Sequence, residues 1–241
     1  MTSTRPVDVF AGEFAGAAST LLADLLMEPG LRLRELARTA SSVHYDTGHA
    51  EVPVLCVATR DAVRLPHTFV TGTLPASPEL VDASWRVVRW WHPARPVGLV
   101  PPPAHRLAEL GGTPYDALDP ETLVGRGAGL TPEGDDVLAA ALVTAHATAD
   151  PRLESWREAT RSALARHRTT AVSRGILHHA LDGYATPELA ELLVTLCRGG
   201  ELPGPVARLR ALGHTSGGAL LDGVAYTLNS RPGVPHHEGA A

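Results

Sequence analysis

The chain has 241 residues, a net charge of −5 and a pI near 6.2, which argues against a nucleic-acid-binding surface because such surfaces are basic. The composition is 44% hydrophobic and 20% charged, as in an ordinary globular domain, and no apolar run reaches the roughly 18 residues that a membrane span needs. All 21 basic residues are arginine, so the chain has no lysine for a P-loop, a pyridoxal Schiff base or a protein kinase.

The first hundred residues predict a small sheet with one flanking helix. Apolar side chains recur at helical spacing from Gly12 to Met27, and Glu28-Pro-Gly30 ends that run. Three or four strand-like runs follow, separated by turn residues: Ser42–Tyr45, Val52–Ala58, His67–Thr71 and Trp85–Trp91.

A proline-dense connector, residues 92–103, separates this part from a region with helical periodicity. The predicted helices are Pro132–Ala147, Pro151–Arg166, Thr170–Leu181, Pro187–Cys197, Pro205–Leu212 and Ser216–Leu228. The arginines from Arg152 to Arg168 alternate with glutamates, which favours a solvated helix face. We therefore predict an α+β fold with a β-rich subdomain (residues 1–103), a helical ligand-binding subdomain (104–230) and a disordered tail (231–241).

A glycine-rich turn, Gly125-Arg-Gly-Ala-Gly-Leu-Thr-Pro-Glu-Gly-Asp-Asp136, precedes the first long helix. Its glycines permit close approach of a ligand to the backbone, and Thr131 is predicted to cap the helix with Pro132 at its first position. A helix start with unpaired N–H groups attracts anions, and an arginine adds a bidentate donor. The alternative is plain helix capping without a ligand. The predicted anion-binding residues here are Arg126, Gly127, Ala128, Gly129, Thr131 and Gly134.

A second turn, Gly213-His-Thr-Ser-Gly-Gly218, repeats the Gly-X-Thr-X-X-Gly skeleton of the first before another helix. Two such helix starts in one pocket would present facing sets of backbone donors. Thr215 and Gly217 are predicted to bind ligand from this side. His214 and Ser216 are candidate catalytic residues, although Ser216 is also explained as a cap because no histidine–acid pair supports it as a nucleophile.

Asp135 and Asp136 form an acidic pair beside the expected anion site. Acidic residues stabilise a first helical turn, which is the structural explanation for both. Beside an anionic ligand, either a divalent cation bridges them or the ligand carries N–H donors that they accept. We favour the donor explanation, which a ureido or carbamoyl group would satisfy.

Other candidate residues carry weaker signals. His178 and His179 are adjacent on a predicted helix, so they face different ways and do not form a metal-binding pair. Cys56 and Cys197 lie far apart in apolar stretches, which is typical of reduced core cysteines. Because reduced cysteines are typical of the cytoplasm, and the N-terminus lacks a signal-peptide pattern, we expect a cytoplasmic protein. No cofactor and no metal ligand set is predicted.

Three segments resemble a bacterial family whose members serve as the AllH-type subunit of oxamate carbamoyltransferase. Gly127-Ala-Gly-Leu-Thr-Pro-Glu-Gly-Asp-Asp136 is similar to the family's GxGLTPxGDD signature. Thr169-Thr-Ala-Val-Ser173 resembles its TTxxS helix, and His214-Thr-Ser-Gly217 resembles its closing turn. The segments occur in the family's order over residues 125–225. Where the family usually has an aspartate, near Ala219, this chain departs from the pattern.

The resemblance implies carbamoyl transfer between a ureido acid such as oxalurate and phosphate, within an assembly of several different subunits. It implies that Arg126 and the Gly127–Gly129 backbone bind an anion, and that Asp135 or Asp136 orients the carbamoyl amide. It adds Ser173 as a ligand contact. The expected partners are carbamoyl phosphate or phosphate, a ureido acid and other protein subunits, without nucleic acid or membrane. The alternatives are a regulatory subunit that binds a metabolite or nucleotide, and a metal-dependent hydrolase that uses Asp135 and Asp136.

Overall fold

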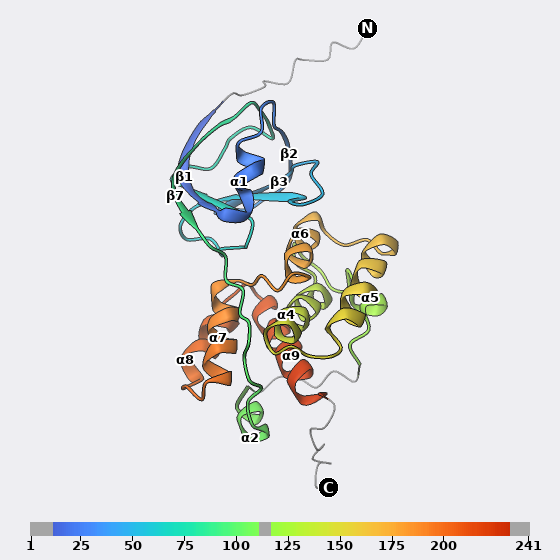
Figure 1. Ribbon diagram of the computed structural model, residues 1–241. Coiled ribbons are helices and arrows are strands. Elements are labelled where there is room, and N and C mark those ends of the chain that lie inside the picture. The colour runs from blue at the N-terminus through green and yellow to red at the C-terminus, as the bar shows by residue number, and fades with distance from the viewer. Residues whose placement is uncertain (1–11, 111–116, 232–241) are drawn as a thin grey trace. The chain divides into compact units, whose positions relative to one another are not determined.

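The computed structural model describes residues 12–110 and 117–231, and the chain divides into two compact units between Pro93 and Ala94 (Figure 1). The first unit is a curled sheet and the second is helical, so the predicted α+β class is confirmed. The tail expected over residues 231–241 lies outside the described residues from position 232 onward. No helix within the described ranges is long and apolar enough to cross a membrane.

The first unit is a seven-stranded sheet with the order β6-β2-β3-β4-β5-β1-β7. Its elements are β1 (Glu13–Ser19), a 3-10 turn (Thr20–Leu22), α1 (Ala23–Leu26), β2 (Arg32–Arg38), β3 (Ser42–Asp46), β4 (Val54–Ala58), β5 (Thr68–Thr71), β6 (Glu79–Val81) and β7 (Ser84–Trp91). Inward-facing side chains such as Tyr45, Leu55 and Phe69 form its core. Strands β3, β4, β5 and β7 lie at the four predicted runs; β3, β4 and β5 are buried along almost their whole length, whereas β7 is exposed or half-buried.

The helix predicted from Gly12 to Met27 is wrong, because residues 13–19 form strand β1 and only residues 23–26 are α-helical. β1 lies between β5 and β7, and a Cβ on Gly16 would come within 2.1 Å of the Val70 carbonyl oxygen. Phe14 and Ala18 suit one face of a strand as well as one face of a helix. Pairing with strands distant in sequence therefore determined the secondary structure of residues 13–19, whose local pattern was ambiguous.

The second unit contains the predicted helices, with ends that differ by a few residues at most. Its elements are α2 (Ala104–Leu107), a 3-10 turn (Ala108–Leu110), α3 (Pro120–Leu123), α4 (Glu133–Ala147), α5 (Leu153–Arg166), α6 (Ala171–Ala180), α7 (Pro187–Cys197), α8 (Pro203–Arg210) and α9 (Ser216–Asn229). The long helix α4 is apolar around nearly its whole circumference, which is why it forms the centre of the unit, with α3, α5, α6 and α9 packed against it.

Helices α4 and α9 run side by side in the same direction. The residues just before and at their starts, Thr131 and Ser216, are hydrogen-bonded, and Gly223 further along α9 touches α4. A Cβ on Gly223 would lie 2.3 Å from the Val137 carbonyl oxygen and 2.9 Å from the Ala140 Cβ. The parallel packing places the two positive helix ends together, a geometry that acidic groups or a bound anion would stabilise.

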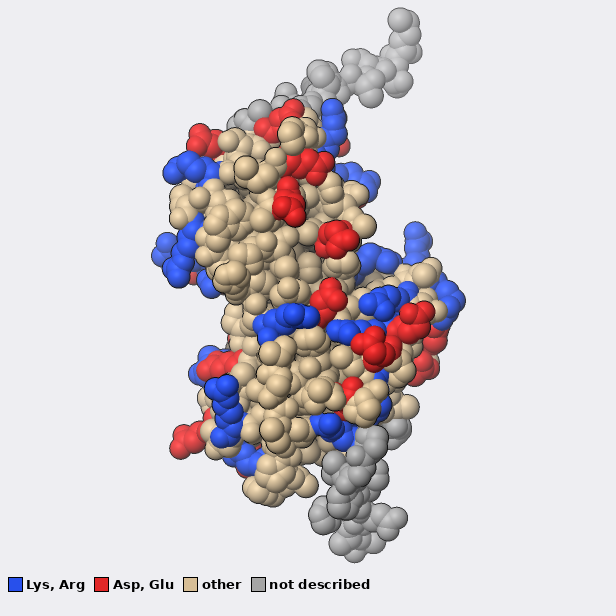
Figure 2. Space-filling model, in the orientation of Figure 1, with Lys and Arg blue, Asp and Glu red and all other residues tan. Residues whose placement is uncertain are grey.

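The solvated face predicted for the arginines of α5 needs correction. Arg152 and Arg157 have side chains only 21% and 15% exposed. Arg152 donates to the carbonyl groups of Thr227 and Ser230 at the end of α9, and Arg157 donates to the Leu181 carbonyl after α6. Their guanidinium groups therefore cap the C-terminal ends of neighbouring helices, where the helix dipole favours a cation. On the surface, Figure 2 shows acidic and basic side chains interspersed over this unit.

Candidate functional site

The starts of α4, α6 and α9 meet at one place in the helical unit. The Thr131 hydroxyl, before α4, lies 2.9 Å from the Ser216 hydroxyl at the start of α9. The Thr170 hydroxyl, which caps α6, also donates to the Leu130 carbonyl in the first glycine turn. The two glycine turns are therefore adjacent in space. In the sequence they are 84 residues apart, counted from Thr131 to the corresponding Thr215 (215 − 131). The structure brings together the three segments that carry the predicted site residues.

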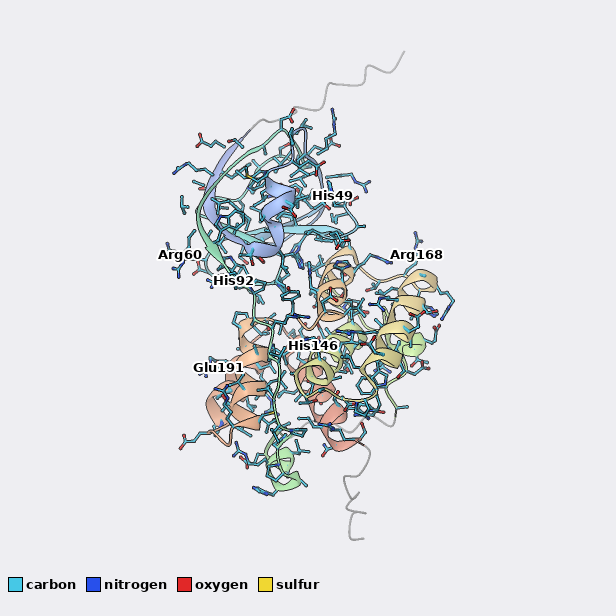
Figure 3. The ribbon with its side chains drawn as sticks, viewed as in Figure 1. His49, Arg60, His92, His146, Arg168 and Glu191 are labelled. Atoms are coloured by element: carbon cyan, nitrogen blue, oxygen red, sulfur yellow. The ribbon has the colours of Figure 1, made fainter. Side chains whose placement is uncertain are left out.

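The glycines of the first turn fall into two groups. Gly125, Gly127 and Gly129 all have left-handed backbone angles, with φ of 74°, 116° and 91°. A Cβ on Gly125 would meet the Arg168 carbonyl oxygen at 2.2 Å, whereas a Cβ on Gly129 would have no described atom within 4 Å. Gly125 is thus required for packing, and Gly129 leaves open space in an exposed part of the turn. Arg168, labelled in Figure 3, extends its side chain outward from the adjoining turn between α5 and α6.

The predicted cap of α4 is wrong: the N-cap residue is Pro132 rather than Thr131, and the Thr131 hydroxyl bonds to Ser216 instead. The turn folds back so that the Arg126 carbonyl accepts from the Gly134 N–H at 2.9 Å. The N–H groups of Asp135 and Asp136 both reach the Pro132 carbonyl. Several first-turn donors of α4 are therefore bonded within the protein, although the positive end of the helix dipole remains at this place.

Asp135 holds the first turn against the start of α6. It is 2% exposed, and its Oδ1 accepts from the Gly125 N–H at 2.9 Å while its Oδ2 accepts from the Thr169 hydroxyl. Both oxygens are thus bonded to groups that shape the loop. Thr169 and Thr170 were part of a sequence motif without an assigned role, and the structure shows that they join α6 to the first turn. Two adjacent threonines before a helix were the available signal.

Asp136 has a different environment from its neighbour. It is 5% exposed, and within the described part of the chain its Oδ2 has no hydrogen-bond partner. Burial raises the pKa of Asp136 to about 7, with the Asp135 carboxylate acting in the same direction and the Ser216 and Thr131 hydroxyls acting against it. A buried carboxyl group with an unpartnered oxygen and a raised pKa, next to two hydroxyls, makes Asp136 a candidate functional residue.

The second turn presents an exposed rim and a buried base. His214 and Thr215 are exposed, and Thr215 is the N-cap of α9 without a side-chain cap bond. Gly217 is buried: its N–H donates to the Leu212 carbonyl, and a Cβ there would lie 2.2 Å from the Leu209 carbonyl oxygen. Ser173, in the first turn of α6, is 1% exposed, and its hydroxyl has no partner among residues 12–110 and 117–231.

A metal-binding arrangement is not formed by the described residues: no group of three or more His, Cys, Asp or Glu side chains lies within reach of a common ion. Asp135, one of the two carboxylates that a hydrolase would use, has both oxygens bonded to Gly125 and Thr169. His178 and His179 differ in burial, as expected for adjacent helical positions, and Cys56 and Cys197 are free thiols.

Comparison with known proteins identifies one family. No curated protein and no solved structure matches the chain. The model of the family described as oxamate carbamoyltransferase subunit AllH matches residues 123–228. The matched segment begins in α3 and ends in α9, and it contains the three helix starts that converge. Through residues 123–228 the chain is similar to the oxamate carbamoyltransferase subunit AllH family, and the resemblance that the three motifs predicted is confirmed.

Proposed function

We propose that the chain is a subunit of a carbamoyltransferase and that its helical unit binds the reactants of carbamoyl transfer between a ureido acid, such as oxalurate, and phosphate. The observation that carries the proposal is the contact between Thr131 and Ser216, which joins the two glycine turns of the matched segment into one site. An oxamate carbamoyltransferase subunit also needs other protein subunits, so partner proteins are part of the proposal.

The site offers two kinds of recognition for such reactants. Three helix starts and Arg126 supply positive potential for a phosphate or carboxylate group. The unpartnered oxygen of Asp136 suits an N–H donor of the ureido group, which a second anion would not provide. Since Asp135 is already fully bonded, Asp136 is the carboxylate that contacts the ligand. The exposed backbone of Ala128 and Gly129, with Thr215 and His214 opposite, forms the open rim.

Carbamoyl transfer needs little covalent assistance from a protein. Two bound anions held in the correct orientation supply much of the rate enhancement. Backbone N–H groups, hydroxyls and arginines then stabilise negative charge on phosphate and on the tetrahedral carbon. The residues gathered here are of those types, which supports acyl-group transfer over metal-assisted hydrolysis.

The test is turnover by a complex isolated through the tagged full-length chain from its native cells. We expect carbamoyl phosphate to form from oxalurate and phosphate, and Arg126→Ala to reduce kcat/KM by about tenfold to a hundredfold, because one charge-assisted contact to an anion is lost. Exposed Arg60→Ala, in the sheet unit, is the matched control and is expected to leave turnover unchanged.

Two results would contradict the proposal in different ways. Absence of turnover with oxalurate and with other ureido acids would remove carbamoyl transfer. Full turnover in Arg126→Ala and Asp136→Ala complexes, combined with phosphate-dependent thermal stabilisation of the isolated chain, would instead indicate a regulatory subunit that binds a metabolite without taking part in the chemistry.

A further inference from the structure

Asp136 has a buried oxygen that the fold itself does not use. Its side chain is 5% exposed, and the Oδ2 atom has no hydrogen-bond partner in the described parts of the chain. Asp135, the preceding residue, is also buried, at 2% exposed, but has both oxygens bonded. Buried polar atoms are normally hydrogen-bonded, so the unpartnered Oδ2 of Asp136 needs an explanation. Its position beside the two glycine turns indicates that it bonds to a ligand.

The hydroxyl groups next to Asp136 form a connected pair. The Thr131 and Ser216 hydroxyls lie 2.9 Å apart, and both interact with the Asp136 carboxyl. A hydroxyl both donates and accepts, so this pair is able to hold the carboxyl in one orientation whether or not it carries a proton. One of the two comes from the loop before α4 and the other from α9, so the orientation depends on the convergence of the helix starts.

We propose that Asp136 is the acid that protonates the leaving nitrogen during carbamoyl transfer, and that Thr131 and Ser216 are its positioning residues. This inference rests on the proposed function. It goes beyond orientation of the carbamoyl amide, because an orienting group needs only a hydrogen bond whereas an acid must give up a proton.

The proposed step balances in atoms and charge. In the direction of carbamoyl phosphate formation, an oxygen of hydrogen phosphate bonds to the carbamoyl carbon, and the bond from that carbon to the ureido nitrogen breaks. The departing nitrogen takes a proton from Asp136 and leaves as an amide. Hydrogen phosphate releases one proton as it becomes carbamoyl phosphate, and this proton restores the acid form of Asp136. No oxidant, reductant or further reactant is needed.

The electrostatic surroundings favour a proton on Asp136 near neutral pH. Burial raises its pKa to about 7, and the carboxylates of Asp135 and Glu133 on the same helix act in the same direction. The Ser216 and Thr131 hydroxyls lower it. The first turns of α6 and α9, the other two helices that start here, contain no acidic residue. A general acid works best with a pKa close to the working pH, and Asp136 meets that condition.

The main test compares complexes that contain the wild-type chain or the Asp136→Asn chain, with oxalurate and phosphate as substrates. Asparagine keeps the size of the side chain and a hydrogen-bonding oxygen but has no acidic proton. We expect kcat to fall by about 10²- to 10⁴-fold with a much smaller change in KM. Asp61→Asn, an exposed change in the sheet unit, is the matched control and is expected to have wild-type kcat.

The pH dependence separates an acid from an orienting group. Wild-type kcat is expected to fall as pH rises above about 7, because Asp136 loses its proton there. Phosphate titrates in the same range, but its contribution is common to both complexes. The difference between the wild-type and Asp136→Asn profiles therefore reports Asp136, and parallel profiles would overturn the inference. In the Ser216→Ala complex, the decline of kcat is expected at higher pH than in the wild-type complex, because the substitution removes a hydroxyl that lowers the pKa of Asp136.

A second readout needs only the isolated chain. The pKa of Asp136 is higher in the folded state, about 7, than its ordinary value of 3.8, so the folded state holds the proton more tightly. Wild-type stability should therefore decline, relative to Asp136→Asn, as pH rises from about 4 to about 7, and the difference should level off above that range. A difference in Tm that does not change with pH would contradict a titrating carboxyl.

The outcomes distinguish the two claims. If the wild-type complex makes no carbamoyl phosphate from any ureido acid, the proposed function is wrong and the inference fails with it. If the wild-type complex turns over and Asp136→Asn retains kcat within about threefold, the proposed function stands and only the proton-transfer role of Asp136 is wrong.

Discussion

Asp135→Ala is expected to destabilise the helical unit by about 3–5 kcal/mol, one of the two largest effects on stability that we predict. The substitution removes two hydrogen bonds to a buried charged group, each of which contributes about 1.5–3 kcal/mol, and leaves the Gly125 N–H and the Thr169 hydroxyl without their acceptor. Helical circular dichroism measures the effect, because the long helices belong to this unit. We expect Tm to fall by about 10 °C.

Asp135→Asn is the matched control for this prediction. The asparagine oxygen still accepts from Gly125, and its amide group donates to the Thr169 hydroxyl, which both donates and accepts. We therefore expect less than half the loss that alanine causes. Equal losses for asparagine and alanine would show that the charge of Asp135, rather than its hydrogen bonds, holds the first turn against α6.

Gly217→Ala is expected to destabilise the same unit by about 3 kcal/mol. A Cβ at this position would lie 2.2 Å from the Leu209 carbonyl oxygen, 2.6 Å from the Arg210 Cα and 2.9 Å from the Arg210 carbonyl carbon. All three are backbone atoms, so the clash is relieved only if α9 moves away from α8. Because Ser216 precedes this residue, the movement also lengthens its contact with Thr131, and we expect turnover to fall together with Tm.

The neighbouring Gly218 provides a control that differs by one position. A Cβ on Gly218 would have no described atom within 4 Å, and the residue is exposed in the first turn of α9. Alanine there is expected to be neutral or to stabilise the protein by up to about 1 kcal/mol, because glycine is a poor helix former. Similar denaturation midpoints for Gly217→Ala and Gly218→Ala would refute close packing between α8 and α9.

The sequence allowed the elements of the helical unit to be predicted well. The apolar positions of α6 and α7 recur with a helical period, and threonine or proline marks their starts, so local pattern and final structure agree. The motif around Gly127–Asp136 also indicated the resemblance to the AllH-type subunit family, since such a motif depends on residue types at fixed spacing. These properties are encoded within short segments and need no knowledge of distant contacts.

The local pattern was insufficient where a distant segment determined the outcome. The apolar positions of residues 13–19 fit a helix and a strand about equally well. These residues form a strand because they pair with β5 and β7. The predicted cap of α4 was wrong because Pro132 is the N-cap residue, and the Arg126 carbonyl accepts a hydrogen bond from the Gly134 N–H in the first turn. Arg152 and Arg157 resembled a solvated face because their acceptors, the ends of α9 and α6, lie far along the chain.

The sequence alone determined that this is an α+β protein with two glycine turns, an acidic pair and a resemblance to a carbamoyltransferase subunit. Only the tertiary structure separated Asp135 from Asp136, because different groups reach the two adjacent carboxylates in the folded chain. Gly125 and Thr169 bond to Asp135, whereas the Ser216 and Thr131 hydroxyls interact with the Asp136 carboxyl, whose Oδ2 has no partner among the described residues. Hydrogen bonding and desolvation depend on what lies within a few ångströms, and helix packing sets those neighbours.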